Sequence, residues 1–411
     1  MSTKHESISR KIVLVCDYFQ TGFGYQEFFL AKEFQALGLK VTVVCSDRYY
    51  PFPAYERTAK EVLGSRLRRI GFAQEAGVRV IRLPIWFEYG QGAVILLKKL
   101  PQTLAKLKPD IIVADGVFTP LAWQVARYKR RHPHPILIFD SHASTFNTQL
   151  YSTWLKRLYM LIYNYFLLPV IKRAAHHFTT VGESEYQMLK SELNLTKKNV
   201  SLIPLGADTR SFKRNNQLRF KMRSLLKIKP QQILLIYAGK VTPNKDLEIL
   251  IEALANVNKQ VNLVKLLILG QGAPDYIINL KQKIKFLHLA DFIIWHPLVA
   301  NQQLPAYYNA ADIGIWPGNL SNTILEAMAV GLPVIVSKKI SAQQTTNHLA
   351  QNQAALQMKR GSSSDLTKIL MKLIDEPRFR SSRGHNCHQL IEQRFSWQQI
   401  AQQHLAVYYK N

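Results

Sequence analysis

Residues 313–337 carry the pattern that most constrains how this chain can fold. Residues 313–316 (IGIW) form a short apolar run of the kind found in buried strands. A turn of Gly, Asn and Ser follows, then a helix-length segment that ends at Gly331, and then the apolar residues 333–337. Two strands joined through a helix are the repeating unit of a doubly wound parallel sheet, so the pattern predicts an α/β fold.

The same alternation of strands and helices extends through the rest of the chain. Strands are predicted at residues 11–16, 40–46, 78–83, 110–114, 136–140, 178–181, 233–239, 266–270 and 292–295. A chain of 411 residues is too long for one typical hydrophobic core. We therefore predict two doubly wound domains, residues 1–204 and 205–390, followed by a helical segment, 391–411, that packs back toward the N-terminal domain.

The turn before the helix of residues 313–337 is a candidate ligand site. Ser321 or Asn322 is expected to cap this helix, so that its first backbone N–H groups point out of the carboxyl edge of the sheet. Unpaired N–H groups and the helix dipole favour anionic ligands there. Glu326 lies one turn inside the helix, where a carboxylate suits neutral sugar hydroxyls better than a phosphate. The alternative interpretation is an ordinary strand–helix–strand unit with a surface Glu.

A second candidate site lies in the first half of the chain. Gly22 and Gly24 form a tight turn between the strand 11–16 and a helix over 25–37. The turn does not match GxGxxG and the chain contains no Walker sequence, so a purely structural turn is the alternative. His142 follows the strand 136–140, at the edge where functional side chains collect, although a structural hydrogen-bonding role is equally compatible with that position.

Two lysines define a third candidate site. Lys240 and Lys245 follow the strand 233–239 and directly precede a predicted helix. Lysines five residues apart at such a turn can both reach one diphosphate, and their charge would stabilise a diphosphate that leaves during a transfer reaction. The alternative is a pair of solvated loop lysines in a basic protein. A further glycine loop, residues 270–272, belongs to the same sheet edge.

The composition is that of a soluble globular protein with a large excess of positive charge. Hydrophobic residues make up 47% of the chain, charged residues make up 20%, and the net charge is +27. Such an excess attracts anionic partners, which include nucleotide-linked substrates, anionic lipid headgroups and nucleic acid. No nucleic-acid-binding module accompanies the charge, so we expect no nucleic-acid partner.

Cysteine usage and hydropathy predict a cytoplasmic location. Cys16, Cys45 and Cys387 give no even disulfide framework and are expected to be buried thiols in a reducing compartment. Residues 1–11 lack the apolar segment of a signal peptide. The longest apolar run, residues 158–171, is shorter than the roughly 20 residues that span a bilayer, so no transmembrane helix is predicted.

Four segments of the chain, taken in their order, resemble one enzyme family. They are residues 203–212 (IPLGADTRSF), 239–245 (GKVTPNK), 304–312 (LPAYYNAAD) and 326–335 (EAMAVGLPVI). Together they resemble motifs of the retaining glycosyltransferases of family 4, and the resemblance covers nearly the whole chain. It implies the GT-B fold, in which two Rossmann-like domains face a cleft, with the acceptor on the N-terminal domain and the nucleotide-sugar donor on the C-terminal domain.

The resemblance also implies roles for individual residues. Lys240 and Lys245 would bind the donor diphosphate, Glu326 would hold the nucleotide ribose, and His142 would lie near the donor sugar on the acceptor side. The implied catalytic residues are His142, Lys240 and Lys245. The implied donor-binding residues are Gly22, Gly24, Gly239, Gly272, Leu320, Ser321, Asn322 and Glu326.

The reaction implied is retaining transfer of a sugar from a nucleotide-sugar donor, of unknown base, to a glycan or lipid-linked acceptor, with no cofactor and no metal. The chain contains no Asp-x-Asp pair, and His385, Cys387 and His388 have no zinc-site spacing with another ligand pair. One departure stands out, because Gly318 occupies the place of the first of the family's paired glutamates. A catalytically impaired sugar-nucleotide-binding protein and a sugar-nucleotide epimerase are therefore the alternatives.

Residues 151–173 make an anionic membrane surface a candidate partner. The segment is rich in Leu, Tyr and Phe, and Lys156, Arg157, Lys172 and Arg173 flank its apolar centre. A helix of this kind can lie in the headgroup layer, which would place the protein peripherally at the inner face of the membrane. The alternative is an interior helix that packs against the parallel sheet.

Overall fold

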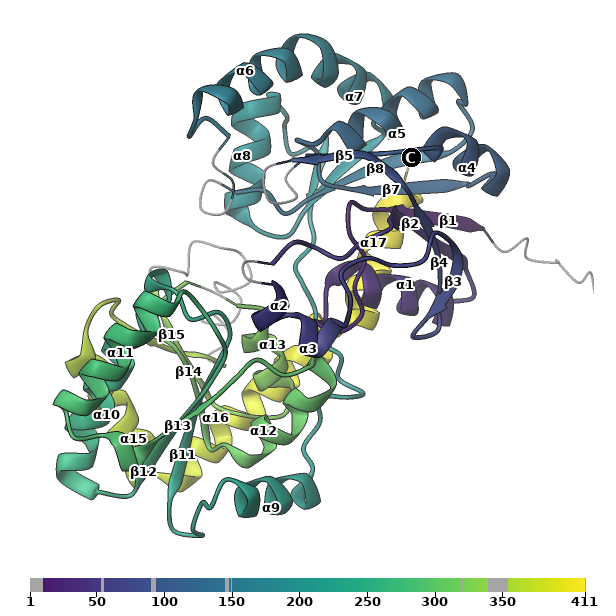
Figure 1. The fold of residues 1–411 in the computed structure, drawn as a ribbon. Helices are drawn as coiled ribbons and strands as arrows, with labels where there is room; N and C mark the ends of the chain where they lie inside the picture. Colours follow the sequence, from purple (N-terminus) through teal and green to yellow (C-terminus); the bar gives the residue numbers. More distant parts are fainter. Residues whose placement is uncertain are drawn as a thin grey trace, which may run out of the picture. The chain divides into compact units, whose positions relative to one another are not determined.

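The computed structural model describes residues 10–52, 55–89, 94–144, 148, 150–319, 321–338 and 354–410. The chain divides into two compact units. Unit 1 contains Met1–Pro204 and Ile400–Asn411, and unit 2 contains Leu205–Gln399. The sequence-based boundary was drawn after the same residue, Pro204, and the end of the chain belongs to unit 1. Each unit is an α/β domain built around its own parallel sheet (Figure 1).

The sheet of unit 1 has eight strands in the order β10-β9-β8-β7-β1-β2-β4-β3. All neighbouring strands are parallel except β3, which pairs antiparallel with β4 at one edge. The strands are β1 (Lys11–Val15), β2 (Lys40–Ser46), β3 (Gly71–Glu75), β4 (Val78–Leu83), β7 (Ile111–Asp115), β8 (Ile136–Ser141), β9 (His177–Thr180) and β10 (Val200–Leu202). A separate hairpin consists of β5 (Ile85–Tyr89) and β6 (Val94–Leu97).

Helices connect these strands. They are α1 (Gln26–Ala36), α2 (Tyr55–Thr58), α3 (Lys60–Leu63), α4 (Leu100–Leu107), α5 (Pro120–Arg131), α6 (Trp154–Ile162), the π-helical turn η1 (Tyr163–Leu167), α7 (Leu168–Ala174) and α8 (Glu183–Leu193). The start of α5 shows how local sequence sets such a boundary. Thr119 accepts a hydrogen bond from the backbone N–H of Ala122, and Pro120 supplies a backbone angle that suits the first helical position.

The sheet of unit 2 has six strands, all parallel, in the order β13-β12-β11-β14-β15-β16. The strands are β11 (Ile233–Ala238), β12 (Val264–Leu269), β13 (Ile293–His296), β14 (Ile313–Trp316), β15 (Val334–Ser337) and β16 (Leu356–Met358). The central strands are almost entirely apolar and buried, as expected when helices cover both faces of a parallel sheet (Figure 1).

The helical elements of unit 2 are short and numerous. They are α9 (Asn216–Leu225), η2 (Pro243–Lys245), α10 (Leu247–Val261), α11 (Pro274–Phe286), η3 (Ala290–Phe292), η4 (Asn301–Gln303), α12 (Leu304–Ala310), α13 (Thr323–Ala329), α15 (Ser363–Asp375), α16 (Pro377–Leu390), η6 (Ile391–Phe395) and α17 (Trp397–Tyr408). The last of these, α17, begins in unit 2 and ends in unit 1.

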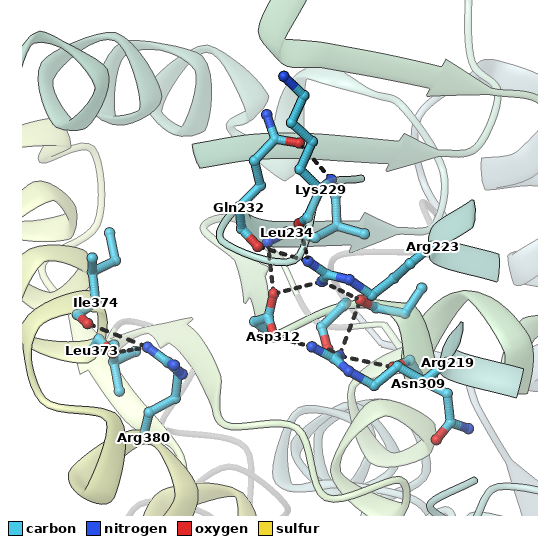
Figure 2. Close-up of polar contacts among 12 residues, drawn as sticks. Arg219, Arg223, Lys229, Gln232, Leu234, Asn309, Asp312, Leu373, Ile374 and Arg380 are labelled. Carbon is cyan, nitrogen blue, oxygen red and sulfur yellow. Dashed lines mark hydrogen bonds and ion pairs between the residues drawn. The ribbon is translucent and has the colours of Figure 1, made fainter. Parts of the chain in front are cut away.

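A cluster of charged groups attaches α9 to the start of β14 (Figure 2). The carboxylate of Asp312 accepts hydrogen bonds from Arg219 at 2.7 Å and from Arg223 at 3.1 Å, and also from the backbone N–H of Leu234 at 2.8 Å. Arg223 also donates to the carbonyl oxygens of Lys229 and Gln232, at 2.9 and 2.7 Å. One carboxylate thus forms ion pairs with two guanidinium groups, and neutral carbonyl oxygens accept further hydrogen bonds from Arg223.

The predicted strands are present with ends that differ by at most two residues, with one exception. The sequence also predicts an apolar strand over residues 200–208, interrupted by Pro204 and Gly206, and β10 contains only Val200–Leu202 of it. The structure adds β3, the β5–β6 hairpin and β16, which the sequence interpretation missed. β3 and β5 are edge or hairpin strands with partly exposed side chains, so they lack the continuous apolar run on which the interpretation relied.

The segment 151–173 does not form the interior helix that was the alternative interpretation. It contains α6, η1 and most of α7, and much of its apolar surface is exposed. Within the described residues, no helix combines the length and hydropathy needed to cross a bilayer.

Candidate functional site

The carboxyl ends of three adjacent strands bring the predicted donor-binding loops of unit 2 together. β11 lies between β12 and β14, and the order of the strands reverses between β11 and β14. In doubly wound sheets, ligands bind at the carboxyl edge where such a reversal occurs. The loops that follow these three strands carry Gly239 to Lys245, Gly270 to Gly272, and Pro317 to Asn322.

Glycines allow these loops to touch through their backbones. A Cβ added at Gly270 would lie 1.9 Å from the carbonyl oxygen of Gly239, and one added at Gly272 would lie 1.6 Å from that of Val241. Gly239 itself has a φ of +147°, which side-chain-bearing residues rarely adopt. Packing therefore explains both predicted glycines, Gly239 and Gly272, and their contact with a donor remains a prediction.

Gly318 is held against the lysine-bearing turn. A Cβ at this position would lie 2.4 Å from the carbonyl oxygen of Asn244 and 2.4 Å from the Cα of Lys245. The next residue, Asn319, donates its backbone N–H to the same Asn244 oxygen at 2.8 Å. The backbone contact thus excludes any side chain at position 318. The two loops can pack this closely because a glycine stands where the family motif has a glutamate.

The two predicted lysines share this turn but have different environments. Lys245 is half-buried, and its ammonium donates to the carbonyl oxygen of Asn319 at 2.8 Å. Burial, and to a smaller extent the positive charge of Lys240, lower the pKa of Lys245 to about 8. Lys240 is exposed at the start of the loop. An anion bound here would relieve the repulsion between the lysines, so the turn favours a ligand with concentrated negative charge.

Glu326 is a buried carboxyl with one oxygen left for a ligand. It lies in α13 and is 6% exposed, and its Oε1 accepts a hydrogen bond from the side-chain amide of Asn301 at 2.6 Å. Its Oε2 is buried and has no hydrogen-bond partner among the described residues. Burial raises the pKa of Glu326 to about 8, although the Asn301 hydrogen bond opposes the shift. A ligand hydroxyl that donated to Oε2 would satisfy this acceptor.

The start of α13 differs from the prediction. The helix begins at Thr323, and neither Ser321 nor Asn322 caps it through a side chain, so that part of the prediction was wrong. Instead, Thr323 donates to the carbonyl oxygen of Ala238 at 2.7 Å, and its hydroxyl lies 2.8 Å from that of Ser321. This contact ties the start of α13 to the end of β11. The predicted donor-binding residue Leu320 lies outside the described residues.

Unit 1 contains the predicted glycine turn at the carboxyl end of β1. Gly24 has a φ of +67°, and a Cβ at Gly22 would lie 2.8 Å from a methyl group of Leu63. The turn leads directly into α1, whose first residues are Gln26 and Glu27. Its two glycines are therefore required by backbone geometry and by packing, and contact with a diphosphate remains a prediction.

His142 lies next to the carboxyl end of β8 and interacts with Asp140. The distance from His142 Nε2 to Asp140 Oδ2 is 3.3 Å, and Thr179 donates to the other oxygen of Asp140 at 2.6 Å. Burial alone would lower the pKa of His142. The hydrogen bond to Asp140, together with the negative charges of Asp140, Asp115 and Glu27, raises it to about 10 instead. His142 therefore carries a positive charge at neutral pH.

Two further carboxyl groups, Glu27 and Asp115, belong to the same site. Glu27 begins α1 and Asp115 ends β7, and each offers an oxygen that lies within 4.8 Å of the other and of a ring nitrogen of His142. Burial raises the pKa of both carboxyl groups, that of Glu27 to about 8. The negative charge of Asp115 adds to the shift of Glu27, and that of Asp140 adds to the shift of Asp115. His142 opposes both shifts. The pair is therefore expected to retain one proton near neutral pH.

These three residues are the one set of potential metal ligands that the described part of the chain brings together. A metal ion and a proton would compete for the same ring nitrogen of His142. The candidates at the C-terminal end have structural partners. Cys387 Sγ lies 3.3 Å from the carbonyl oxygen of Ala354, and His388 Nδ1 lies 2.7 Å from that of Ala329.

The sequence analysis did not predict Glu27, Asp115 or Asn301 as site residues. It also did not predict that Asp140 would be the partner of His142. A usable signal existed for the two aspartates, because each ends a predicted strand at the carboxyl edge, where functional groups collect. Glu27 and Asn301 carry no such signal. Each reaches its site from a helical segment whose position depends on the tertiary fold.

Comparisons with known families cover most of the chain. Residues 29–206 match the family model described as a glycosyl transferase 4-like domain, and residues 232–376 match the model described as glycosyl transferases group 1. These two regions contain the carboxyl-edge loops of unit 1 after β7 and β8 and those of unit 2 after β11, β12 and β14.

Several curated proteins are similar over part of the chain. The lipopolysaccharide 1,2-N-acetylglucosaminetransferase of Salmonella typhimurium is 28% identical over 233 residues, which are 53% of this chain and 58% of the relative. The alpha-monoglucosyldiacylglycerol synthase of Streptococcus pneumoniae is 29% identical over 140 residues, 33% of this chain and 31% of that protein. The chain thus matches a third to somewhat more than half of the length of these relatives.

Solved structures resemble the whole chain. HepE of Anabaena in complex with UDP superimposes with a TM-score of 0.71 at 18% identity, covering 98% of this chain and 100% of that one. WaaG, a glycosyltransferase involved in lipopolysaccharide biosynthesis, gives a TM-score of 0.63 at 15% identity, covering 97% and 100%. At these identities the likeness concerns the fold. The chain belongs to the glycosyltransferases with group 1 and 4-like domains, and it has the GT-B fold.

Proposed function

We propose that the protein is a retaining glycosyltransferase that moves a sugar from a nucleotide-sugar donor to a glycan or lipid-linked acceptor. In this reaction the bond between the anomeric carbon and the diphosphate oxygen breaks, and the bond to the acceptor oxygen forms on the same face of the sugar. The acceptor proton leaves with the nucleoside diphosphate. The relatives support this class, since those named above transfer or add sugars to lipopolysaccharide or a diacylglycerol lipid.

The observation that carries the proposal is that a half-buried lysine and a buried carboxyl group, one oxygen of which has no hydrogen-bond partner among the described residues, lie on the same sheet edge. Lys245 offers positive charge for a diphosphate, and Glu326 Oε2 offers an acceptor for a hydroxyl. A nucleoside diphosphate carries both complementary groups, a charged diphosphate and a ribose diol. HepE, which shares the fold, is described in complex with UDP and with UDP-glucose.

Unit 1 would supply the acceptor-side groups. His142 is positively charged and is oriented by Asp140, so it can stabilise negative charge near the donor sugar. The Glu27–Asp115 pair can accept hydrogen bonds from acceptor hydroxyls.

We propose that no metal takes part, since lysines and an imidazolium can neutralise the negative charge of the leaving diphosphate. Turnover should then persist in EDTA.

We propose further that the reaction takes place in the cytoplasm, with the acceptor presented at an anionic membrane surface. The three cysteines are all free and buried, which suits a reducing compartment. Lipid-linked acceptors are found at such surfaces, and the net charge of +27 favours them.

The Glu326→Gln variant tests the donor site. Binding of UDP, GDP, ADP and dTDP to the wild-type protein is measured by thermal shift, and the dissociation constant of the best ligand is measured by calorimetry. We expect the variant to bind that ligand about tenfold or more weakly, because Asn301 would hold the oxygen of the new side-chain amide and leave its NH2 group where the ligand hydroxyl needs an acceptor. Glu248→Gln, in the neighbouring helix α10, is the control. Equal affinities of all three proteins would remove Glu326 from the site.

Because packing explains the glycine at position 318, Gly318 does not by itself favour an impaired binding protein or an epimerase. The same packing allows a prediction about substitutions at this position. Gly318→Ala should weaken diphosphate binding and lower the melting temperature, because the added methyl group meets the backbone of Asn244 and Lys245. Gly318→Glu should be worse, and it should not restore activity toward a common hexose donor. Gly77→Ala, in unit 1, is the control for binding: its positive φ strains an alanine and should also lower the melting temperature, but diphosphate binding should be unchanged. An active, stable Gly318→Glu variant would favour the impaired binding protein instead.

A further inference from the structure

Among the described residues of unit 1, the outer face of α6 and η1 carries the longest run of exposed large apolar side chains. It consists of Trp154, Leu155, Leu158, Leu161, Ile162, Tyr165 and Phe166, and we call it the α6 face. Trp154, Tyr165 and Phe166 are 71%, 75% and 69% exposed. The spacing of three and four residues places these side chains along one side of the helix.

The opposite side of the same segment is already used for packing. Met160, Tyr163 and Ile171 are fully buried in the core of unit 1. The hydroxyls of Tyr159 and Tyr163 donate to the carbonyl oxygens of Phe118 and Val117, at 2.9 and 3.1 Å. The segment is therefore apolar on both sides. A helix that is hydrophobic all round is normally covered on both sides, either by protein or by lipid.

The charges around the α6 face select its partner. Residues 141–182 contain no Asp or Glu. Lys156 and Arg157 lie near the N-terminal end of the face, Lys172 and Arg173 follow its C-terminal end, and all four are exposed. At the start of the segment, Tyr151 donates to the carboxylate of Glu192 at 2.6 Å.

From these observations we infer that the α6 face docks on an anionic lipid bilayer. Its Trp, Tyr and Phe side chains would enter the headgroup layer, and the four basic residues would contact lipid phosphates. A second copy of the chain fits less well, because a symmetric contact between two such faces would bring like charges together. The inference rests on the proposed function, which includes a lipid-linked acceptor. It deepens that function by identifying the surface that contacts the membrane.

Vesicle binding tests the inference without donor or acceptor. The full chain is sedimented with vesicles of phosphatidylcholine alone or with about 30% phosphatidylglycerol, in low and high salt. We expect binding to the anionic vesicles in low salt and release in high salt. A Trp154→Gln/Tyr165→Gln/Phe166→Gln variant should bind about tenfold or more weakly, and so should Lys172→Ser/Arg173→Ser. Phe220→Gln/Phe286→Gln, which removes two exposed aromatics of unit 2, should bind like wild type.

The variants are expected to fold, since the replaced side chains point away from the core, and their melting temperatures check this. Trp154→Tyr should still bind but lose part of the blue shift of tryptophan fluorescence that vesicles cause. Equal recovery of wild type in the supernatant with anionic and neutral vesicles would overturn the inference. So would a concentration-dependent dimer that the triple variant abolishes. Vesicle binding with no activity on any donor would refute the proposed function alone.

Discussion

Lys245→Ala should lower turnover by about 100-fold or more and should weaken donor binding as well. The ammonium of Lys245 lies on the loop that contacts Asn319, at the carboxyl edge where the donor diphosphate is proposed to bind. Negative charge grows on the diphosphate as the sugar leaves, so a fixed positive charge stabilises the transition state more than the bound donor. The turnover number and the Michaelis constant are measured for wild type and variant with the same donor.

The pH dependence of donor binding gives an independent check on Lys245. Its pKa is lowered to about 8 in the free protein, so the ammonium is charged below pH 8 and loses its proton above it. Affinity for a diphosphate should therefore fall as pH rises through about 8, and Lys245→Arg should shift this loss to higher pH. Lys259→Ala, on the exposed surface of α10, is the control. Unchanged kinetics in Lys245→Ala would exclude the proposed role.

Asp312→Ala should lower the free energy of unfolding by about 3 kcal/mol or more. The side chain of Asp312 is 12% exposed and forms ion pairs with both Arg219 and Arg223, and removing it leaves the guanidinium of Arg223 buried without its counter-charge. The backbone N–H of Leu234 at the start of β11 also loses its acceptor (Figure 2). Urea unfolding, followed by circular dichroism, measures the effect.

Asp375→Ala is the matched control for Asp312→Ala, since Asp375 is an exposed residue at the end of α15. Its substitution should change stability by less than about 0.5 kcal/mol. A change equally small for Asp312→Ala would mean that the cluster contributes no net stability. This result would also show that α9 does not depend on these ion pairs for its attachment.

The parallel strands of both units could be predicted from sequence because buried strands are continuous apolar runs. β11 and β14 are examples, and their ends agree with the structure to within one residue. β3 could not be predicted in this way, since it lies at a sheet edge with alternating exposure. Nor could the exposure of Trp154 and Phe166, because the sequence of a helix that is apolar all round does not reveal which side the protein covers.

The positions of candidate residues were predictable where they lie in the loop or the first helical turn after a predicted strand. His142 follows β8 directly, Lys245 lies in the turn after β11, and Glu326 lies in the first turn of α13, after β14. Their contact with a donor remains a prediction. The close contact of Gly318 with the turn at Asn244 was not predictable, because it depends on the separation of two loops that are distant in sequence.

The central claim is that the protein transfers a sugar, and product analysis tests it most directly. Wild type and Lys245→Ala are incubated with each nucleotide sugar and with a membrane lipid and glycan fraction. Nucleoside diphosphate release is quantified, and the products are examined by mass spectrometry and NMR. We predict diphosphate release matched by a new glycosidic bond with the anomeric configuration of the donor, and about 100-fold less of both in the variant. An epimerised nucleotide sugar with its diphosphate bond intact, or tight nucleotide binding without any turnover, would contradict the claim.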